Sequence, residues 1–197
     1  MTFDLNTLLD IFKVGVGLVY LYLEYHARPS MWVASVIMPA IGLVLFWNKG
    51  LYADCAINCY YLIIAVYGFI AWTRHSHKKD KGSGLRISHI PSSKALILLG
   101  CLLLIWGCIA FILHKFTDST VIFADSLTTS MSIIGMWMLA RKYVEQWLVW
   151  FVVDAIYVWL YYKKQIYFSG SLYVFYTIMA LFGYRRWSKQ IAPTSHK

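Results

Sequence analysis

Seven long apolar segments, separated by short polar stretches, dominate the chain. Each has about the 20 apolar residues that an α-helix needs to cross the roughly 30 Å hydrocarbon core of a bilayer. We therefore predict an all-α integral membrane protein with seven transmembrane helices. The predicted spans are Leu8–Tyr25, Met31–Trp47, Leu51–Trp72, Ala95–Leu113, Thr120–Leu139, Val144–Tyr162 and Ile166–Tyr184.

Composition supports a membrane protein, and the distribution of charge predicts its orientation. Hydrophobic residues make up 60% of the chain and charged residues 14%, and the mean hydropathy is +0.59. The net charge of +9 comes from basic residues between the spans, as expected for topology signals rather than for a nucleic-acid interface. Most of them fall on one side, which predicts an N-terminus outside and a C-terminus in the cytoplasm.

Sequence signals for cofactors and metals are missing. No phosphate-binding loop, nucleophile elbow or zinc-protease motif occurs in the chain. The four cysteines lie inside apolar segments and lack the set of histidine or acidic ligands that a zinc site needs, so they are interpreted as buried packing residues: Cys55, Cys59, Cys101 and Cys108. We expect no cofactor, no metal, no nucleic-acid partner and no enzymatic activity.

An offset of 115 residues aligns the third span with the seventh without gaps, and the same offset relates the second span to the sixth. The matched pairs include Trp32 with Trp147, Gly68 with Gly183 and Trp72 with Trp187. Two three-helix bundles separated by one linker helix then have the same orientation, a 3+1+3 parallel repeat with a site expected at the midplane where the bundles meet. The predicted parts are bundle 1–72, basic cytoplasmic loop 73–94, linker helix 95–113, bundle 114–187 and cytoplasmic tail 188–197.

The sixth span carries an acid among aromatic residues. Trp147, Trp150, Asp154 and Tyr157 follow helical spacing and share one face. Because an indole attracts cations and stacks on flat rings, this face suits a small cationic aromatic molecule. An interfacial aromatic belt, with the acid bonded to a neighbouring helix, is the alternative.

Two other spans contribute further candidates for the same ligand. Asn58 and Tyr61 share a face of the third span with Asp54, and Thr129 shares a face of the fifth span with Asp125. Gln146, at the start of the sixth span, is placed with Tyr61 at the edge of the pocket. Interhelical hydrogen bonding is the alternative role for Asn58 and for the hydroxyl residues.

An intramembrane aspartyl protease is the one enzymatic alternative. Asp125 and Asp154 would form its catalytic pair, but neither follows the Tyr-Asp or Gly-x-Gly-Asp pattern of such enzymes. We therefore rank it far below a transporter.

The stretch from Ser132 to Trp187, together with "KGLYADCAINCYYLIIAVYGFIAW", resembles the PnuC family of vitamin transporters. The resemblance rests on a Trp-x-x-x-Asn-like element and on the repeat ends "GFIAW" and "GYRRW". It implies a fold like an enlarged SWEET sugar transporter and facilitated uptake of nicotinamide riboside across a bacterial inner membrane. A separate cytoplasmic kinase would trap the product by phosphorylation, and homo-oligomerisation is left open.

One residue departs from the family pattern. The nicotinamide riboside transporters that this chain resembles have a motif like Trp-x-x-x-Asn at this place. In this chain the corresponding residues are Trp150 and Asp154. A carboxylate only accepts hydrogen bonds, whereas an amide also donates to ribose hydroxyls. Asp154 therefore favours a ligand with amino donors, and thiamine is the alternative substrate.

Overall fold

In the described residues of the computed structural model, all long secondary-structure elements are helices, as the apolar segments predict. The structure describes residues 5–48, 52–74, 85–116, 121–163, 165 and 167–191. The helices are α1 (Leu5–Tyr25), α2 (Met31–Asn48), α3 (Tyr52–Arg74), α4 (Ser92–Phe116), α5 (Ile122–Ala140), α6 (Gln146–Lys163) and α7 (Tyr167–Gln190). Each predicted span overlaps one of these helices, and the predicted first residues Leu51, Thr120 and Ile166 lie outside the described residues.

Among the described residues, four helical segments are long and apolar enough to cross a membrane. They are Met31–Asn48, Cys55–Arg74, Ser92–Phe116 and Ile122–Ala140. The prediction of a multi-pass membrane protein is thus confirmed at this coarser level. Helix α4 has no fully buried residue: Leu98, Leu102 and Ile105 pack against the core of the second unit, and many of its other apolar side chains are exposed. Such a surface is stable in hydrocarbon and costly in water.

The chain divides into two compact units, residues 1–85 and 86–197. In the first unit, α2 packs on both α1 and α3. The Trp32 ring meets the Trp72 ring edge-on at 5.6 Å between centroids. A Cβ atom added to Gly68 would collide with the Trp32 indole. The glycine is therefore what allows α3 to approach α2 at this point.

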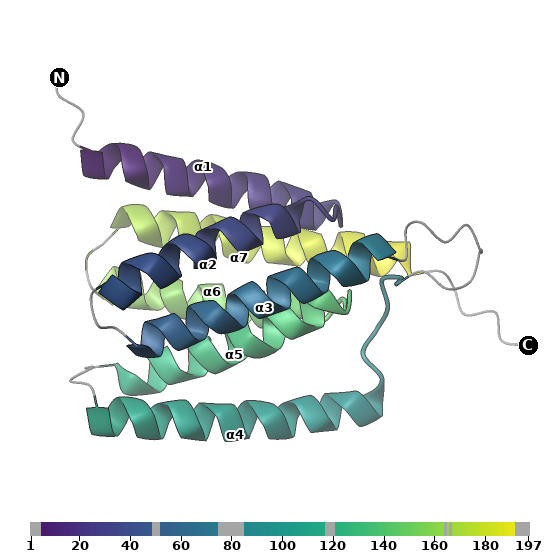
Figure 1. Ribbon diagram of the computed structural model, residues 1–197. Coiled ribbons are helices and arrows are strands. Elements are labelled where there is room, and N and C mark those ends of the chain that lie inside the picture. Colours follow the sequence, from purple (N-terminus) through teal and green to yellow (C-terminus); the bar gives the residue numbers. More distant parts are fainter. Residues whose placement is uncertain are drawn as a thin grey trace, which may run out of the picture. The chain divides into compact units, whose positions relative to one another are not determined.

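The second unit contains α4 to α7, in which α5 packs on both α4 and α6, and α6 packs on α7 (Figure 1). Here the Trp147 and Trp187 rings meet edge-on at 5.7 Å. A Cβ atom on Gly183 would lie 2.5 Å from the Trp147 indole. The same kind of aromatic and glycine contact therefore occurs in each unit.

The turns after α1 and α5 also share their backbone conformation. Ala27 and Lys142 have positive φ angles of 51° and 56°. The Ala27 amide donates to the Glu24 carbonyl at 2.8 Å, and the Lys142 amide donates to the Leu139 carbonyl at 2.9 Å. Lys142 stands 115 positions after Ala27, and Leu139 stands 115 positions after Glu24.

The segment before α4 is attached to the connection between α5 and α6. Ser88 exchanges backbone hydrogen bonds with Lys142 and Val144, at 3.2 and 3.1 Å. The Glu145 carboxylate contacts His89 Nδ1 at 2.7 Å and accepts from the Ile90 amide at 3.1 Å. Helix α4 begins directly after Pro91, whose ring fixes a helical φ. These bonds hold the start of α4 beside α5.

Replacing Glu145 with Ala is expected to release this attachment. One lost hydrogen bond of about 1 kcal/mol corresponds to about fivefold faster exchange of the Ile90 amide hydrogen. Hydrogen exchange followed by mass spectrometry of peptides covering residues 86–92 measures this change. His89→Ala serves as the control, because it leaves the bond from the Ile90 amide to Glu145 in place. Equal exchange in both variants would contradict the assignment.

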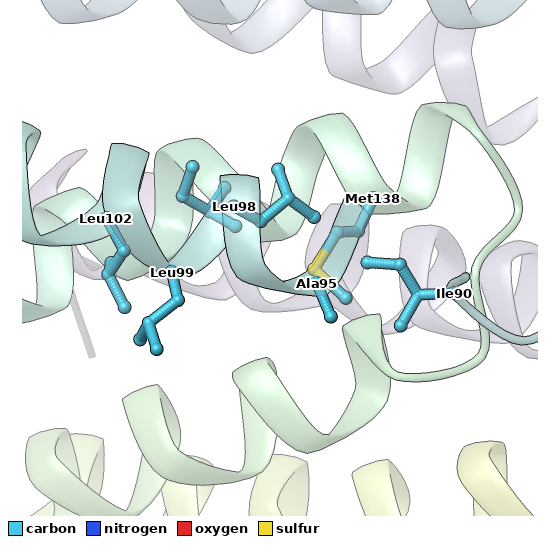
Figure 2. Close-up of a pocket in the computed structure, with 7 residues that line it drawn as sticks. Ile90, Ala95, Leu98, Leu99, Leu102 and Met138 are labelled. Atoms are coloured by element: carbon cyan, nitrogen blue, oxygen red, sulfur yellow. The ribbon is translucent and has the colours of Figure 1, made fainter. Parts of the chain in front are cut away.

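A groove of about 210 Å³ runs between α4 and α5 in the second unit (Figure 2). Its lining is entirely apolar and consists of Ile90, Ala95, Leu98, Leu99, Leu102, Ile134 and Met138. A hydrophilic vitamin would leave its hydroxyl and amide groups without partners there. The groove suits hydrocarbon, so the ligand site has to be sought elsewhere.

The prediction that all four cysteines are buried is wrong for three of them. Cys55 is buried, whereas Cys59, Cys101 and Cys108 are exposed. The reason is that hydropathy reports only that a segment is apolar. It does not distinguish the face of a membrane helix that packs on protein from the face that meets lipid.

Candidate functional site

Asp154 stands at the middle of α6 and is 9% exposed. Within the described part of the chain, its carboxyl group has no hydrogen-bond or ion-pair partner. A buried acid without a partner is expensive in a membrane protein, and such residues usually mark a ligand or ion site. Asp154 is therefore the centre of the candidate site.

Trp150 lies one turn before Asp154 and packs against α5. A Cβ atom on Gly135 would be 3.5 Å from the Trp150 indole, which is ordinary van der Waals distance and places the ring beside α5. The indole Nε1 is buried and has no hydrogen-bond partner among the described residues. Trp150 and Asp154 thus place an unused donor and an unused acceptor one helical turn apart.

Trp147 and Gln146, the other two candidates near the start of α6, are deeply buried. Trp147 is 2% exposed and its ring is enclosed by Gly183 and Trp187 of α7. Gln146 is fully buried, and its backbone amide donates to the Tyr143 carbonyl at 3.3 Å. The surroundings of Trp147 favour packing between α6 and α7 over contact with a ligand.

Tyr157 joins α6 to α5 at the next turn. Its hydroxyl faces the side chain of Thr128, which is fully buried and also donates to the Ala124 carbonyl at 2.9 Å. Sequence reasoning selected Thr129, which is half-buried and makes no side-chain hydrogen bond in the described structure. Thr128 was missed because adjacent hydroxyl residues give no periodic signal for which of them faces inward.

Three tyrosines gather near Asp154, and the sequence pattern had singled out only one of them, Tyr157. Asp154 is close enough to interact electrostatically with Tyr157, Tyr173 and Tyr176. The Tyr173 ring lies 5.0 Å from Tyr157 and 5.3 Å from Tyr161, between centroids. Tyr161 follows Tyr157 by one turn and extends the face that carries Trp150, so its spacing was a usable signal. Tyr173 and Tyr176 come from α7, and only the packing of α6 on α7 places them here.

Asn58 and Tyr61 belong to the first unit. The Asn58 side chain lies against α2, and a Cβ atom on Gly42 would be 2.5 Å from its Oδ1. The Tyr61 ring lies 5.7 Å from that of Tyr60. Asp54 lies in α3, but its side chain falls outside the described part of the structure. These contacts favour a packing role for Asn58 within its own bundle.

The site has the chemistry of a binding site. Among the described residues, no group of three His, Cys, Asp or Glu side chains could hold a metal ion. Asp154 supplies negative charge, Trp150 supplies an indole face and a donor, and the tyrosines supply further rings. Carboxylate and aromatic faces together attract flat organic cations.

Residues 7–189 match the sequence model of a family described as "Nicotinamide mononucleotide transporter". Nicotinamide riboside transporter PnuC of Escherichia coli (strain K12) is 26% identical, with 87% of this chain and 81% of the relative covered. Riboflavin/roseoflavin transporter RibM of Streptomyces davaonensis is 28% identical, with 87% of this chain and 80% of the relative covered.

A crystal structure of the vitamin B3 transporter PnuC has a similar fold. The TM-score is 0.68, the sequence identity is 18%, and the similarity covers 90% of this chain and 79% of that chain. At this identity the comparison establishes the fold.

Proposed function

Because the chain belongs to the nicotinamide mononucleotide transporter family, also called the PnuC family, we propose that it carries nicotinamide riboside into the bacterial cytoplasm by facilitated diffusion. The chain is a membrane transporter and not an enzyme, since its relatives and its structural neighbour are transporters. The aspartyl protease alternative is therefore set aside.

The observation that carries the proposal is the pairing of Trp150 with Asp154 on α6. The indole would stack on the pyridinium ring, which is a fixed cation, and its Nε1 could donate to a ligand oxygen. The Asp154 carboxylate would accept a hydrogen bond from a ribose hydroxyl and balance the positive charge. The ligand thus provides the partners that both buried groups lack within the described part of the chain.

Thiamine is the second candidate, and Asp154 is the reason. Its aminopyrimidine ring carries an amino donor and its thiazolium ring a fixed positive charge, and both complement a carboxylate. Riboflavin, which the Streptomyces relative is named for, has a neutral ring system and gains nothing from the charge of Asp154. We rank nicotinamide riboside first, thiamine second and riboflavin last.

Duplication of a three-helix bundle is the proposed architecture, with α4 as the linker. The aromatic contacts Trp32 with Trp72 and Trp147 with Trp187 support it, as do the matching turns at Ala27 and Lys142. In the first unit, Tyr20 of α1 and Ser35 of α2 stand 115 positions before Gly135 of α5 and Trp150 of α6. Each unit thus pairs one large and one small residue at these positions. The large residue is on the first helix of the pair in the first unit and on the second helix in the second unit. The excess of basic residues on one side supports an N-terminus outside and a C-terminus in the cytoplasm.

Uptake into liposomes that contain only this protein tests the proposal. Labelled nicotinamide riboside should equilibrate across the membrane without ATP or an ion gradient, as expected for facilitated diffusion. An internal nicotinamide riboside kinase with ATP should convert equilibration into accumulation, because phosphorylation keeps the internal substrate concentration low. Uptake of thiamine alone would select the second candidate, and uptake of neither vitamin would contradict the proposed function.

Replacing Trp150 with Ala is expected to weaken vitamin binding by at least ~1 kcal/mol, or about fivefold in Kd, because cation–π stacking is lost. Isothermal titration calorimetry of the purified protein measures this change. Trp159→Ala is the matched control, since Trp159 lies on the same helix and is 53% exposed. An unchanged Kd in Trp150→Ala would remove this indole from the site.

A further inference from the structure

Four tyrosines of α6 and α7 form a continuous group of rings, which we call the tyrosine cluster: Tyr157, Tyr161, Tyr173 and Tyr176. Tyr173 is central, with ring centroids 5.0 Å from Tyr157, 5.3 Å from Tyr161 and 5.8 Å from Tyr176. Its ring is tilted by 43° and 32° to the first two and is nearly perpendicular to the third, at 77°. All four side chains are half-buried, so each ring keeps some accessible surface.

Two carboxyl groups lie near the cluster. The buried Asp154 acts electrostatically on Tyr157, Tyr173 and Tyr176, and Asp125 of α5 acts on Tyr157. Among the described residues, no lysine or arginine forms an ion pair with Asp154. The faces of the rings add to the attraction, since the aromatic quadrupole is negative there.

The tyrosine cluster lies on one side of Asp154 along the helix axes. Tyr161 is two turns beyond Asp154, about 10 Å along α6 at 1.5 Å per residue. It lies near the C-terminal end of α6, and Asp125 and Tyr173 lie near the N-terminal ends of α5 and α7. Arg141 and Lys142, by contrast, follow the C-terminal end of α5. The cluster therefore extends from Asp154 toward the end of the bundle that is away from these basic residues.

We propose that the tyrosine cluster is a cation-binding surface that continues the vitamin site from Asp154 toward this end of the bundle and selects positively charged vitamins over neutral ones. The inference rests on the proposed function and adds to the proposed Trp150–Asp154 face three residues that select a charged vitamin over a neutral one: Tyr161, Tyr173 and Tyr176. In the proposed orientation the cluster faces the outside, so a cation would meet these rings before Trp150. A neutral vitamin would gain only ring contact.

Tyr173→Leu tests the proposal, because leucine keeps an apolar side chain and removes the aromatic quadrupole. The probes are nicotinamide riboside and its dihydro form, which has the same ribose and amide groups but no charge. We expect the variant to raise the Kd of the cation about fivefold and that of the neutral form less than twofold. Tyr173→Phe, which keeps the ring, should stay within twofold of the unchanged protein for both probes.

Tyr167→Leu is the matched control on the same helix. Tyr167 is 58% exposed and pairs with Tyr162 outside the cluster, so its replacement should leave both Kd values unchanged. Equal weakening of cation and neutral form in Tyr173→Leu would indicate a packing role and overturn the inference, as would no weakening of either. If the unchanged protein binds neither nicotinamide riboside nor thiamine, the proposed function itself fails. That result is distinct from one in which the vitamin binds and substitutions in the tyrosine cluster do not change its Kd.

Discussion

Asp154→Asn is expected to change the preference between thiamine and nicotinamide riboside by at least about tenfold. The variant loses a charge-assisted hydrogen bond to the amino group of thiamine, and a tenfold change in Kd corresponds to ~1.4 kcal/mol. Nicotinamide riboside also loses an electrostatic attraction, but the amide can both donate to and accept from its ribose hydroxyls. Its Kd is therefore expected to change less. Calorimetric titration of the variant with each vitamin measures the ratio.

The control for this experiment is Glu145→Gln, which removes one negative charge elsewhere in the same unit. Glu145 contacts His89 in the connection between α5 and α6 and belongs to no ligand contact in our proposal. Its replacement should leave the ratio of the two Kd values within twofold of the original. If Asp154→Asn also leaves that ratio unchanged, Asp154 does not contact the ligand.

Gly183→Ala is expected to destabilise the second unit by about 1–3 kcal/mol, the usual range for overpacking a close-packed contact. The added Cβ atom would lie 2.5 Å from the Trp147 indole, which is itself 2% exposed and held against Trp187. A large rigid ring in this position has no low-energy way to move aside. Gly68→Ala should have a similar effect in the first unit, because its Cβ atom would meet Trp32.

Gly100→Ala and Gly107→Ala are matched controls within the same protein. Both glycines lie in α4, and an added Cβ atom would meet nothing within 4 Å. There the better helix propensity of alanine should keep or slightly raise stability, by up to about 1 kcal/mol. The apparent Tm in detergent compares the variants. If the Tm of Gly183→Ala equals that of the controls, the Trp147 indole moves aside at little energetic cost, which would contradict the prediction.

The course of the helices could be predicted almost completely from the sequence. Helix α2 begins at Met31 and α1 ends at Tyr25, as predicted. The largest difference is at the end of α7, which the apolar pattern predicted to end at Tyr184 and which continues to Gln190. The last residues include Arg185 and Arg186, which are too polar for a hydrophobicity signal. Backbone hydrogen bonds nevertheless extend the helix beyond the apolar segment.

The candidate site could be predicted only in part. Helical spacing placed Trp150, Asp154 and Tyr157 on one face, because 3.6 residues per turn applies within a single helix. It could not decide that Thr128 rather than Thr129 faces Tyr157, or that Trp147 is enclosed by α7. Those outcomes depend on which faces of neighbouring helices meet.

The sequence by itself determined that the chain is a bundle of apolar helices with an acid where apolar residues are expected, because length, hydropathy and spacing are properties of single segments. The tertiary structure decided which side chains surround that acid. Tyr173 and Tyr176 are far from Asp154 along the chain and reach it because α7 packs on α6. This packing depends on the close approach at Gly183, and no pattern within one helix reports the shape of its neighbour.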